Sequence, residues 1–157
     1  MLFIRISLLT VSLGFILSCS KTCYCKTATL NLDYISFDPA KLDTVIMRRY
    51  SKGNNFSGIL NADTLTVANA VFKVNKDTIS IHPNNVASNV SSYFDYIFYL
   101  PSLNRRDSLT DIYESRDTEK GGHDLECNCI NRVYSYYLNL DTVKITDPTS
   151  PHVYIKQ

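Results

Sequence analysis

Lysine and arginine form no basic stripe in this chain, and its formal net charge is only +1. The largest basic clusters are the pairs Arg48-Arg49 and Arg105-Arg106. A protein that binds nucleic acid, or that binds a membrane surface through basic residues, has a basic excess or a basic stripe. The charge pattern therefore excludes nucleic acid as a predicted partner.

Recognisable catalytic motifs are also missing. The sequence lacks Gly-x-Ser-x-Gly, His-Glu-x-x-His, Gly-x-Gly-x-x-Gly and the phosphate-binding Gly-x-x-x-x-Gly-Lys-Ser/Thr. The three histidines (His82, His123 and His152) lie beside a proline or after Gly-Gly, in turn-like contexts. We therefore predict no catalytic residues, no enzyme activity and no cofactor.

Long apolar runs are absent beyond the first eighteen residues, so no later segment has the ~18–20 apolar residues of a membrane span. In the N-terminal segment Arg5 precedes an apolar run that stops at Cys19. This is the pattern of an export signal. Residues Ile16-Leu17-Ser18-Cys19 resemble the bacterial lipobox, which implies a helical signal peptide over 1–18 and lipidation of Cys19. The alternatives are an ordinary signal peptide cut nearby and an uncleaved anchor.

The rest of the chain has the composition of β-strands, with 11 tyrosines, 7 phenylalanines and no tryptophan. Apolar and polar residues alternate with a period of two, and turn-forming residues separate the runs. Strands are predicted at 27–37, 44–50, 64–74, 78–82, 93–100, 108–114, 127–140, 142–146 and 152–156. We predict an all-β fold, an antiparallel β-sandwich of seven to nine strands, immunoglobulin-like or transthyretin-like. The core tryptophan of antibody-type domains is missing.

Removal of residues 1–18 takes away Arg5 and no acidic residue, so the net charge falls to zero. We assign residues 19–26 to the lipidated cysteine and a short tether, and residues 27–157 to a single sandwich domain.

Aromatic residues are dense in the segment 93–100, where Tyr96 and Phe98 share one face of the predicted strand. Sugars stack on flat aromatic faces, which suggests a glycan platform. The same side chains are what a sandwich buries between its sheets. We predict that they belong to the core.

Four cysteines follow Cys19 in two Cys-x-Cys motifs, and about a hundred residues separate the two motifs. The candidate disulfide residues are Cys23, Cys25, Cys127 and Cys129. Residues i and i+2 of a strand point to the same face, so each motif presents two sulfurs side by side. Export to an oxidising compartment and an even cysteine count favour two cross-strand disulfides. The connectivity stays open between Cys23–Cys127 with Cys25–Cys129 and Cys23–Cys129 with Cys25–Cys127.

Two alternatives remain for the same four cysteines. They stay free or only partly paired, or they form a metal site with His123 as an extra ligand. Structural zinc sites usually contain Cys-x2-Cys, and zinc thiolates are uncommon in oxidising compartments. We therefore predict no metal and treat His123 as a loop residue.

Five triplets of the form Asp-Thr/Ser-aliphatic occur along the chain. An aspartate ends a turn by bonding to its own backbone and a threonine then opens a strand, which explains the pattern structurally. The triplets also resemble the O-glycosylation acceptor sequence of Bacteroidota. That resemblance makes candidate glycosylation sites of Thr44, Thr64, Thr78, Ser108 and Thr142.

The lipobox, the two Cys-x-Cys motifs and the β-pattern together are similar to the small lipoproteins of Bacteroidota. The resemblance implies a location and brings no activity. Ser20-Lys21-Thr22 follow the cysteine, in place of the acidic residues of surface-displayed members, and Asp is absent at position 20. We therefore expect an outer-membrane lipoprotein on the periplasmic face, anchored by lipid, with a protein or glycan partner in the envelope.

A binding, accessory or structural module is the favoured function, and a cysteine-based redox or metal-binding protein is the alternative.

Overall fold

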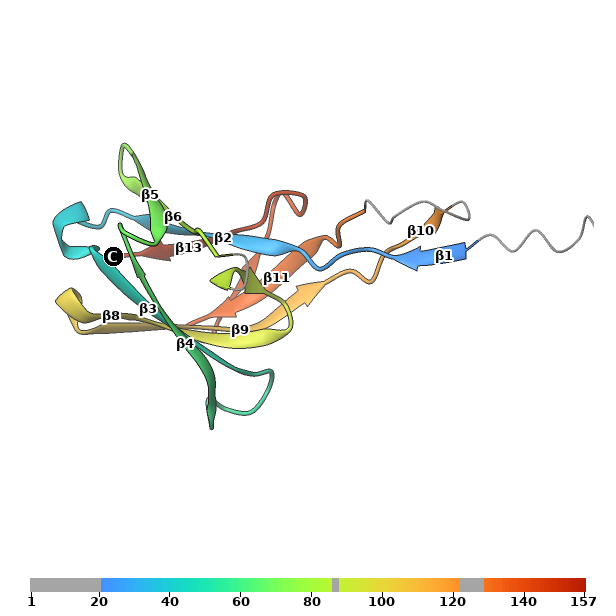
Figure 1. Ribbon diagram of the computed structural model, residues 1–157, viewed down its shortest axis with the longest axis horizontal. Helices are drawn as coiled ribbons and strands as arrows, with labels where there is room; N and C mark the ends of the chain where they lie inside the picture. The colour runs from blue at the N-terminus through green and yellow to red at the C-terminus, as the bar shows by residue number, and fades with distance from the viewer. Residues whose placement is uncertain (1–20, 86–87, 122–128) are drawn as a thin grey trace, which may run out of the picture.

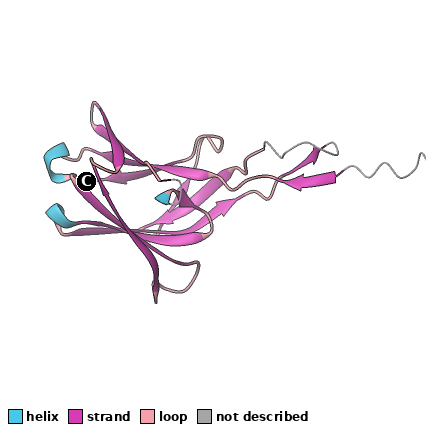
Figure 2. Ribbon diagram, viewed as in Figure 1, coloured by secondary structure: helices cyan, strands magenta, loops and turns pink. Residues whose placement is uncertain are grey.

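The computed structural model describes residues 21–85, 88–121 and 129–157. Two β-sheets pack face to face, and a two-stranded ribbon projects from one end of this sandwich, opposite the C-terminus (Figure 1). The predicted all-β sandwich is confirmed, and strands make up most of the regular structure in these residues (Figure 2). The predicted signal peptide and Cys19 lie outside the described residues.

The six-stranded sheet, here called the large sheet, is antiparallel throughout. From edge to edge it contains β12 (Asp141–Lys144), β11 (Val133–Leu138), β9 (Arg105–Glu114), β8 (Phe94–Leu100), β3 (Thr44–Ser51) and β4 (Ile59–Thr66). Two short 3-10 turns precede β3 and link β8 to β9; they are η1 (Pro39–Lys41) and η3 (Pro101–Leu103).

The five-stranded sheet, here called the small sheet, covers the other side of the core. It contains β13 (His152–Lys156), β2 (Thr29–Ile35), β6 (Thr78–Pro83), β5 (Ala70–Asn75) and β7 (Val90–Ser91), which pairs with β2. Strand β13 runs parallel to β2, an exception to the antiparallel order that we expect. The ribbon consists of β1 (Lys21–Tyr24) and β10 (Thr118–Gly121), paired antiparallel.

The described residues contain thirteen strands, more than the seven to nine predicted. One predicted strand, 64–74, is wrong, because β4 ends at Thr66 and β5 begins at Ala70 in the other sheet. Asn69 makes the break. Its Oδ1 accepts the Thr66 N–H at 2.8 Å and its Nδ2 donates to the Thr64 carbonyl at 2.7 Å, which closes a local turn in place of a strand ladder. The remaining extra strands, β1, β7 and β10, are too short to give an alternating pattern.

Both sheets send alternate side chains into one core. On β8, Tyr96, Phe98 and Leu100 are fully buried, so the prediction that the aromatic residues of this segment belong to the core is confirmed for Tyr96 and Phe98. The small sheet contributes its buried residues to the same core, among them Leu32, Tyr34, Ile79, Ile81, Val153 and Ile155. Burial of each such side chain contributes about 1.5–3 kcal/mol of transfer free energy, which stabilises the packing of the two sheets against each other.

Two tyrosines in this core differ in how their hydroxyl groups are satisfied. Tyr136 Oη donates to the His152 carbonyl at 3.1 Å and accepts the Tyr154 N–H at 3.4 Å. Tyr34 Oη has no hydrogen-bond partner within the described part of the chain. Burial raises the pKa of the Tyr34 phenol above its ordinary value, and the negative charge of Asp107 raises it further.

Tyr34→Phe is therefore expected to leave the free energy of unfolding unchanged or to raise it by up to about 1–2 kcal/mol, because it removes a buried hydroxyl without a partner. Folding raises the pKa of this phenol, so its contribution to the free energy of unfolding is fully present at pH values below its unfolded pKa of about 10. That contribution is lost as the pH rises toward the pKa of the folded state. Denaturant titrations at about pH 7 and about pH 11 should show a smaller alkaline loss for Tyr34→Phe than for the wild type.

The matched control is Tyr136→Phe, which removes a hydroxyl with two hydrogen bonds and is expected to cost about 1 kcal/mol. If Tyr34→Phe were the more destabilising of the two variants, the assignment of the unsatisfied hydroxyl to Tyr34 would be wrong.

Candidate functional site

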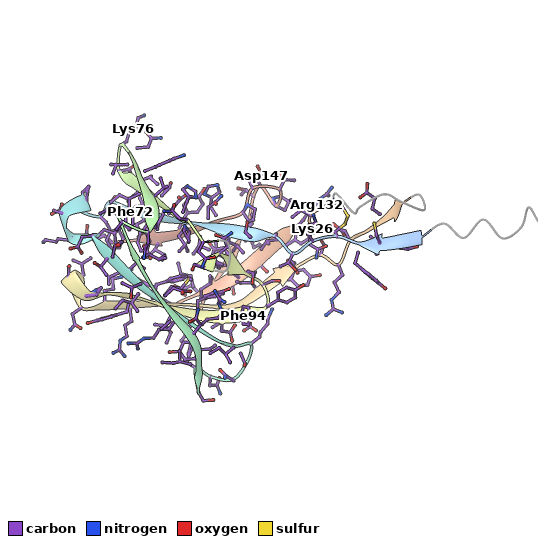
Figure 3. The ribbon with its side chains drawn as sticks, in the orientation of Figure 1. Lys26, Phe72, Lys76, Phe94, Arg132 and Asp147 are labelled. Carbon is purple, nitrogen blue, oxygen red and sulfur yellow. A yellow bond between two sulfur atoms is a disulfide. The ribbon has the colours of Figure 1, made fainter. Side chains whose placement is uncertain are left out.

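A disulfide lies where the ribbon meets the sandwich, beside Lys26 and Arg132 (Figure 3). It joins Cys25 to Cys129, whose Cα atoms are 4.8 Å apart and which are 104 residues apart in sequence. A disulfide thus connects the two Cys-x-Cys motifs, as predicted, and the connectivity that pairs Cys25 with Cys127 is excluded.

The first Cys-x-Cys motif has no free thiol. Cys23 is disulfide-bonded like Cys25, and Cys127 lies outside the described residues, as does His123. Metal coordination requires a thiolate, and a disulfide sulfur is not one. In this form Cys25 and Cys129 therefore offer no ligand to the metal site that the sequence leaves as an alternative. No group of three or more His, Cys, Asp or Glu side chains suited to a metal occurs within residues 21–85, 88–121 and 129–157.

Backbone hydrogen bonds hold the chain on both sides of this disulfide. The Cys25 N–H donates to the Asp117 carbonyl and the Lys26 N–H donates to the Cys129 carbonyl, both at 3.0 Å, while the Asn131 N–H donates to the Lys26 carbonyl at 2.8 Å. Residues 25 and 26 therefore lie between the segment that leads into β10 and the segment that leads into β11. We call this region the junction.

Side chains extend the junction into the sandwich. Glu114 Oε2 accepts the Ala28 N–H at 3.3 Å, and Glu114 Oε1 accepts from Asn131 Nδ2 at 3.4 Å. Asn131 Oδ1 in turn accepts the Asp117 N–H at 3.0 Å. A half-buried carboxylate at the end of β9 thus ties the base of the ribbon to the large sheet, so the ribbon is fixed to the sandwich by covalent, backbone and side-chain bonds together.

A second polar cluster lies at the start of β13. Asp33 Oδ2 is 2.6 Å from His152 Nδ1, and His152 Nε2 is 3.4 Å from Ser150 Oγ. Asp33 is buried, and its second oxygen, Oδ1, has no hydrogen-bond partner in the described ranges. The imidazole also stacks on the Tyr154 ring at 5.7 Å between centroids. Because a carboxylate only accepts, Nδ1 carries the proton of the short bond.

A hydroxyl, an imidazole and a carboxylate in this order resemble the relay of a serine hydrolase. Two observations favour a structural role instead. The Ser150 to His152 distance exceeds the roughly 2.6–3.2 Å of a nucleophile and its base. The Ser150 N–H, which in that chemistry helps to form the oxyanion hole, donates to the Asp147 carbonyl at 3.3 Å. We assign Asp33 and His152 to a latch that holds the parallel strand β13 on β2.

The five Asp-Thr/Ser-aliphatic triplets occupy different environments. Thr44 and Thr78 open β3 and β6, as the turn-and-strand explanation predicts, and Asp141 opens β12 just before Thr142. The explanation is wrong for Thr64 and Ser108, which lie inside β4 and β9.

Asp107, the residue before Ser108, makes side-chain contacts in place of an N-terminal turn. Asp107 is buried, accepts a bidentate contact from Arg105 and accepts from Asn139 Nδ2 at 2.8 Å. Among the candidate glycosylation sites, Thr64 and Thr142 are exposed, whereas Thr44, Thr78 and Ser108 are half-buried.

A cavity of about 310 Å³ opens at the end of the large sheet from which the ribbon emerges. Its lining includes Lys52, Tyr93, Ile112, Tyr113, Glu114 and Arg116. We call it the tyrosine pocket. Its residues come from the β3–β4 turn, from the segment between β7 and β8, and from the end of β9 and the loop after it. Sequence reasoning missed this site because no local motif links these three segments. The aromatic-rich stretch 93–100, which contains Tyr93, marked only one of them.

Comparison of the chain with known protein families, with curated proteins and with solved structures found no match. The described residues include no helix with the length and apolar character that a membrane crossing needs.

Proposed function

We propose that the protein is a lipid-anchored binding or accessory module of the bacterial outer membrane, in which a disulfide-fixed stalk holds a β-sandwich away from the lipid surface. The observation that carries the proposal is the position of the ribbon. Strand β1 begins at Lys21, two residues after Cys19, and leads directly into the junction at Cys25.

A ribbon in this position would set the distance between the lipid anchor and the sandwich. An extended chain rises about 3.3 Å per residue, so the described segment from Lys21 to Cys25 spans about 13 Å. A single strand of that length is flexible, but here β10 pairs with β1 along its full length. The ribbon is fixed at its base by Glu114, Asn131 and the disulfide. A lipid on Cys19 would then present the sandwich, and the tyrosine pocket beside its base, at a defined height.

Cys19→Ala is expected to abolish membrane association, because lipidation of this one thiol starts the attachment of every acyl chain. Fractionation of cells that produce the variant should place the protein in the soluble fraction, or leave it uncleaved. The matched control, Ser20→Ala, leaves the thiol in place and should stay with the membranes. A processed Cys19→Ala protein that still fractionates with membranes would remove the basis of the lipid anchor.

A cysteine-based redox function is the second candidate. Against it, the Cys25–Cys129 bond lies between segments that the backbone already pairs, which is the environment of a structural cross-link. Titration of thiols with and without reductant, together with metal analysis of the purified protein, separates the two functions. A structural cross-link gives no free thiol before reduction.

A further inference from the structure

We infer that the tyrosine pocket binds a sugar ring that carries a carboxylate, the unit of an acidic polysaccharide. The inference rests on the proposed function as a binding module and names the class of ligand. It comes from three properties of the pocket: its walls are fixed before any ligand arrives, its aromatic faces are exposed, and its free charge is positive.

The side chain of Lys52 fixes the first wall. Its ammonium group donates to the Ile112 carbonyl at 2.7 Å and to the Ser92 carbonyl at 3.3 Å. One side chain from the β3–β4 turn therefore joins the end of β9 to the segment before β8. A cation that bonds two carbonyl groups also keeps its charge, because neither partner is anionic.

The buried carboxylate of Asp95 also joins the β3–β4 turn to β9. Its Oδ2 accepts the Gly53 N–H at 2.7 Å and its Oδ1 accepts the Asp111 N–H at 3.3 Å. Asp111 has φ of 48°, and the pairing of β9 with β11 shifts register at this point. This is a β-bulge, a feature that re-aims side chains and is frequent beside functional sites. Here it sets the direction of the next residues, Ile112 and Tyr113, both of which line the pocket.

Aromatic side chains on this face are exposed, in contrast to those of the core. Tyr93 and Tyr113 are 64% and 63% exposed, and the Tyr113 ring lies 6.1 Å from the Tyr134 ring on the neighbouring strand β11. Exposed tyrosines next to a cavity offer flat apolar faces together with hydroxyl groups at their edges. A pyranose ring has the same combination of C–H faces and hydroxyl edges.

The charges of the pocket select an anionic ligand. Lys52 and Arg116 are positive and Glu114 is negative, so the lining carries a net positive charge. Glu114 accepts from Ala28 and Asn131 in the junction. Arg116 is exposed, and within the described part of the chain it has no hydrogen bond or ion pair. A guanidinium binds a carboxylate through two parallel hydrogen bonds, which makes Arg116 the residue that recognises the acid group.

The size of the cavity agrees with a small ligand. Its volume of about 310 Å³ lies at the lower end of the roughly 300–1,000 Å³ of ligand sites, enough for one or two sugar rings.

Titration of the purified full-length protein with tetragalacturonic acid, and with neutral galactotetraose as the matched ligand, tests the inference by calorimetry. Sialyllactose and lactose form a second pair that distinguishes the source of the carboxylate. Binding of an acidic member of either pair, at least about tenfold tighter than its neutral partner, is the expected result. Equal binding of acidic and neutral saccharides, or no binding of either, would overturn the inference.

Arg116→Gln and Tyr113→Ala are expected to weaken binding of the acidic ligand by about tenfold or more. Tyr154→Ala, which removes another exposed tyrosine (47% exposed, on β13) outside the pocket, is expected to leave it unchanged. An acidic peptide, tetraglutamate, serves as the control for charge alone. If it binds as tightly as the acidic saccharide, the pocket recognises anions in general and the sugar assignment is wrong. Failure of these titrations leaves the lipid anchor intact, because membrane fractionation of Cys19→Ala tests that part separately.

Discussion

The variant Cys25→Ser/Cys129→Ser is expected to lose about 2–5 kcal/mol of unfolding free energy relative to the wild type. The bond closes a loop of 104 residues, for which the chain-entropy estimate is about 4–5 kcal/mol. For a domain stable by about 5–15 kcal/mol, this is a large share of the total. Denaturant unfolding at neutral pH, followed by circular dichroism, measures the loss, and reduction of the wild type should produce a loss at least as large.

Loss of the disulfide should destabilise the ribbon more than the sandwich. Strands β1 and β10 pair with each other, and the ribbon is joined to the domain at the junction, where the Cys25 N–H and the Lys26 N–H donate to the carbonyl groups of Asp117 and Cys129. Amide exchange in β1 and β10 is therefore expected to accelerate in the variant, while amides of the core strands stay protected. A chelator added to the wild type serves as the control and should change nothing. If the chelator destabilised the protein, a metal and not a disulfide would hold the junction.

His152→Ala is expected to lower the free energy of unfolding by about 2–4 kcal/mol. The substitution removes the donor that lies 2.6 Å from Asp33 Oδ2. Asp33 Oδ1 already has no partner in the described residues, so the variant would bury a carboxylate with neither oxygen satisfied by a side chain. The strand β13 is an edge strand and pairs only with β2 among the described strands, so its release should appear as faster amide exchange in residues 152–156.

Two further variants separate the latch from a catalytic relay. Ser150→Ala removes an exposed hydroxyl at 3.4 Å and is expected to change stability by less than about 0.5 kcal/mol. The double variant Asp33→Ala/His152→Ala should cost less than the sum of its single variants, because it removes the unpaired charge together with its partner. A Ser150→Ala loss as large as that of His152→Ala would contradict the latch.

The fold class was predictable because period-two alternation reports which face of a strand is buried. Tyr96 and Phe98 have that spacing, and both are in the core. The same rule failed at 64–74, since Val67 and Ala68 continue the apolar pattern although the Asn69 side chain closes a turn there. A polar side chain that bonds to the backbone of residues a few positions earlier is invisible to an alternation rule, which counts only apolar positions.

Of the candidate site residues, the sequence located the cysteines that meet at the junction. Equal spacing within the two Cys-x-Cys motifs is a local signal, and an oxidising compartment makes a disulfide the expected outcome. The latch was not predictable in this way. Asp33 and His152 are 119 residues apart, and they meet only because β13 pairs in parallel with β2.

By itself, the sequence determined that this chain forms an all-β sandwich and that a disulfide joins its two cysteine motifs, because both properties depend on residue types at short, regular spacing. The tertiary structure decided that the disulfide fixes a projecting ribbon, and that Lys52, Tyr113 and Arg116 line one pocket. Long-range strand order and one β-bulge at Asp111 place these residues together. Those features depend on the summed packing of both sheets, which no single segment encodes.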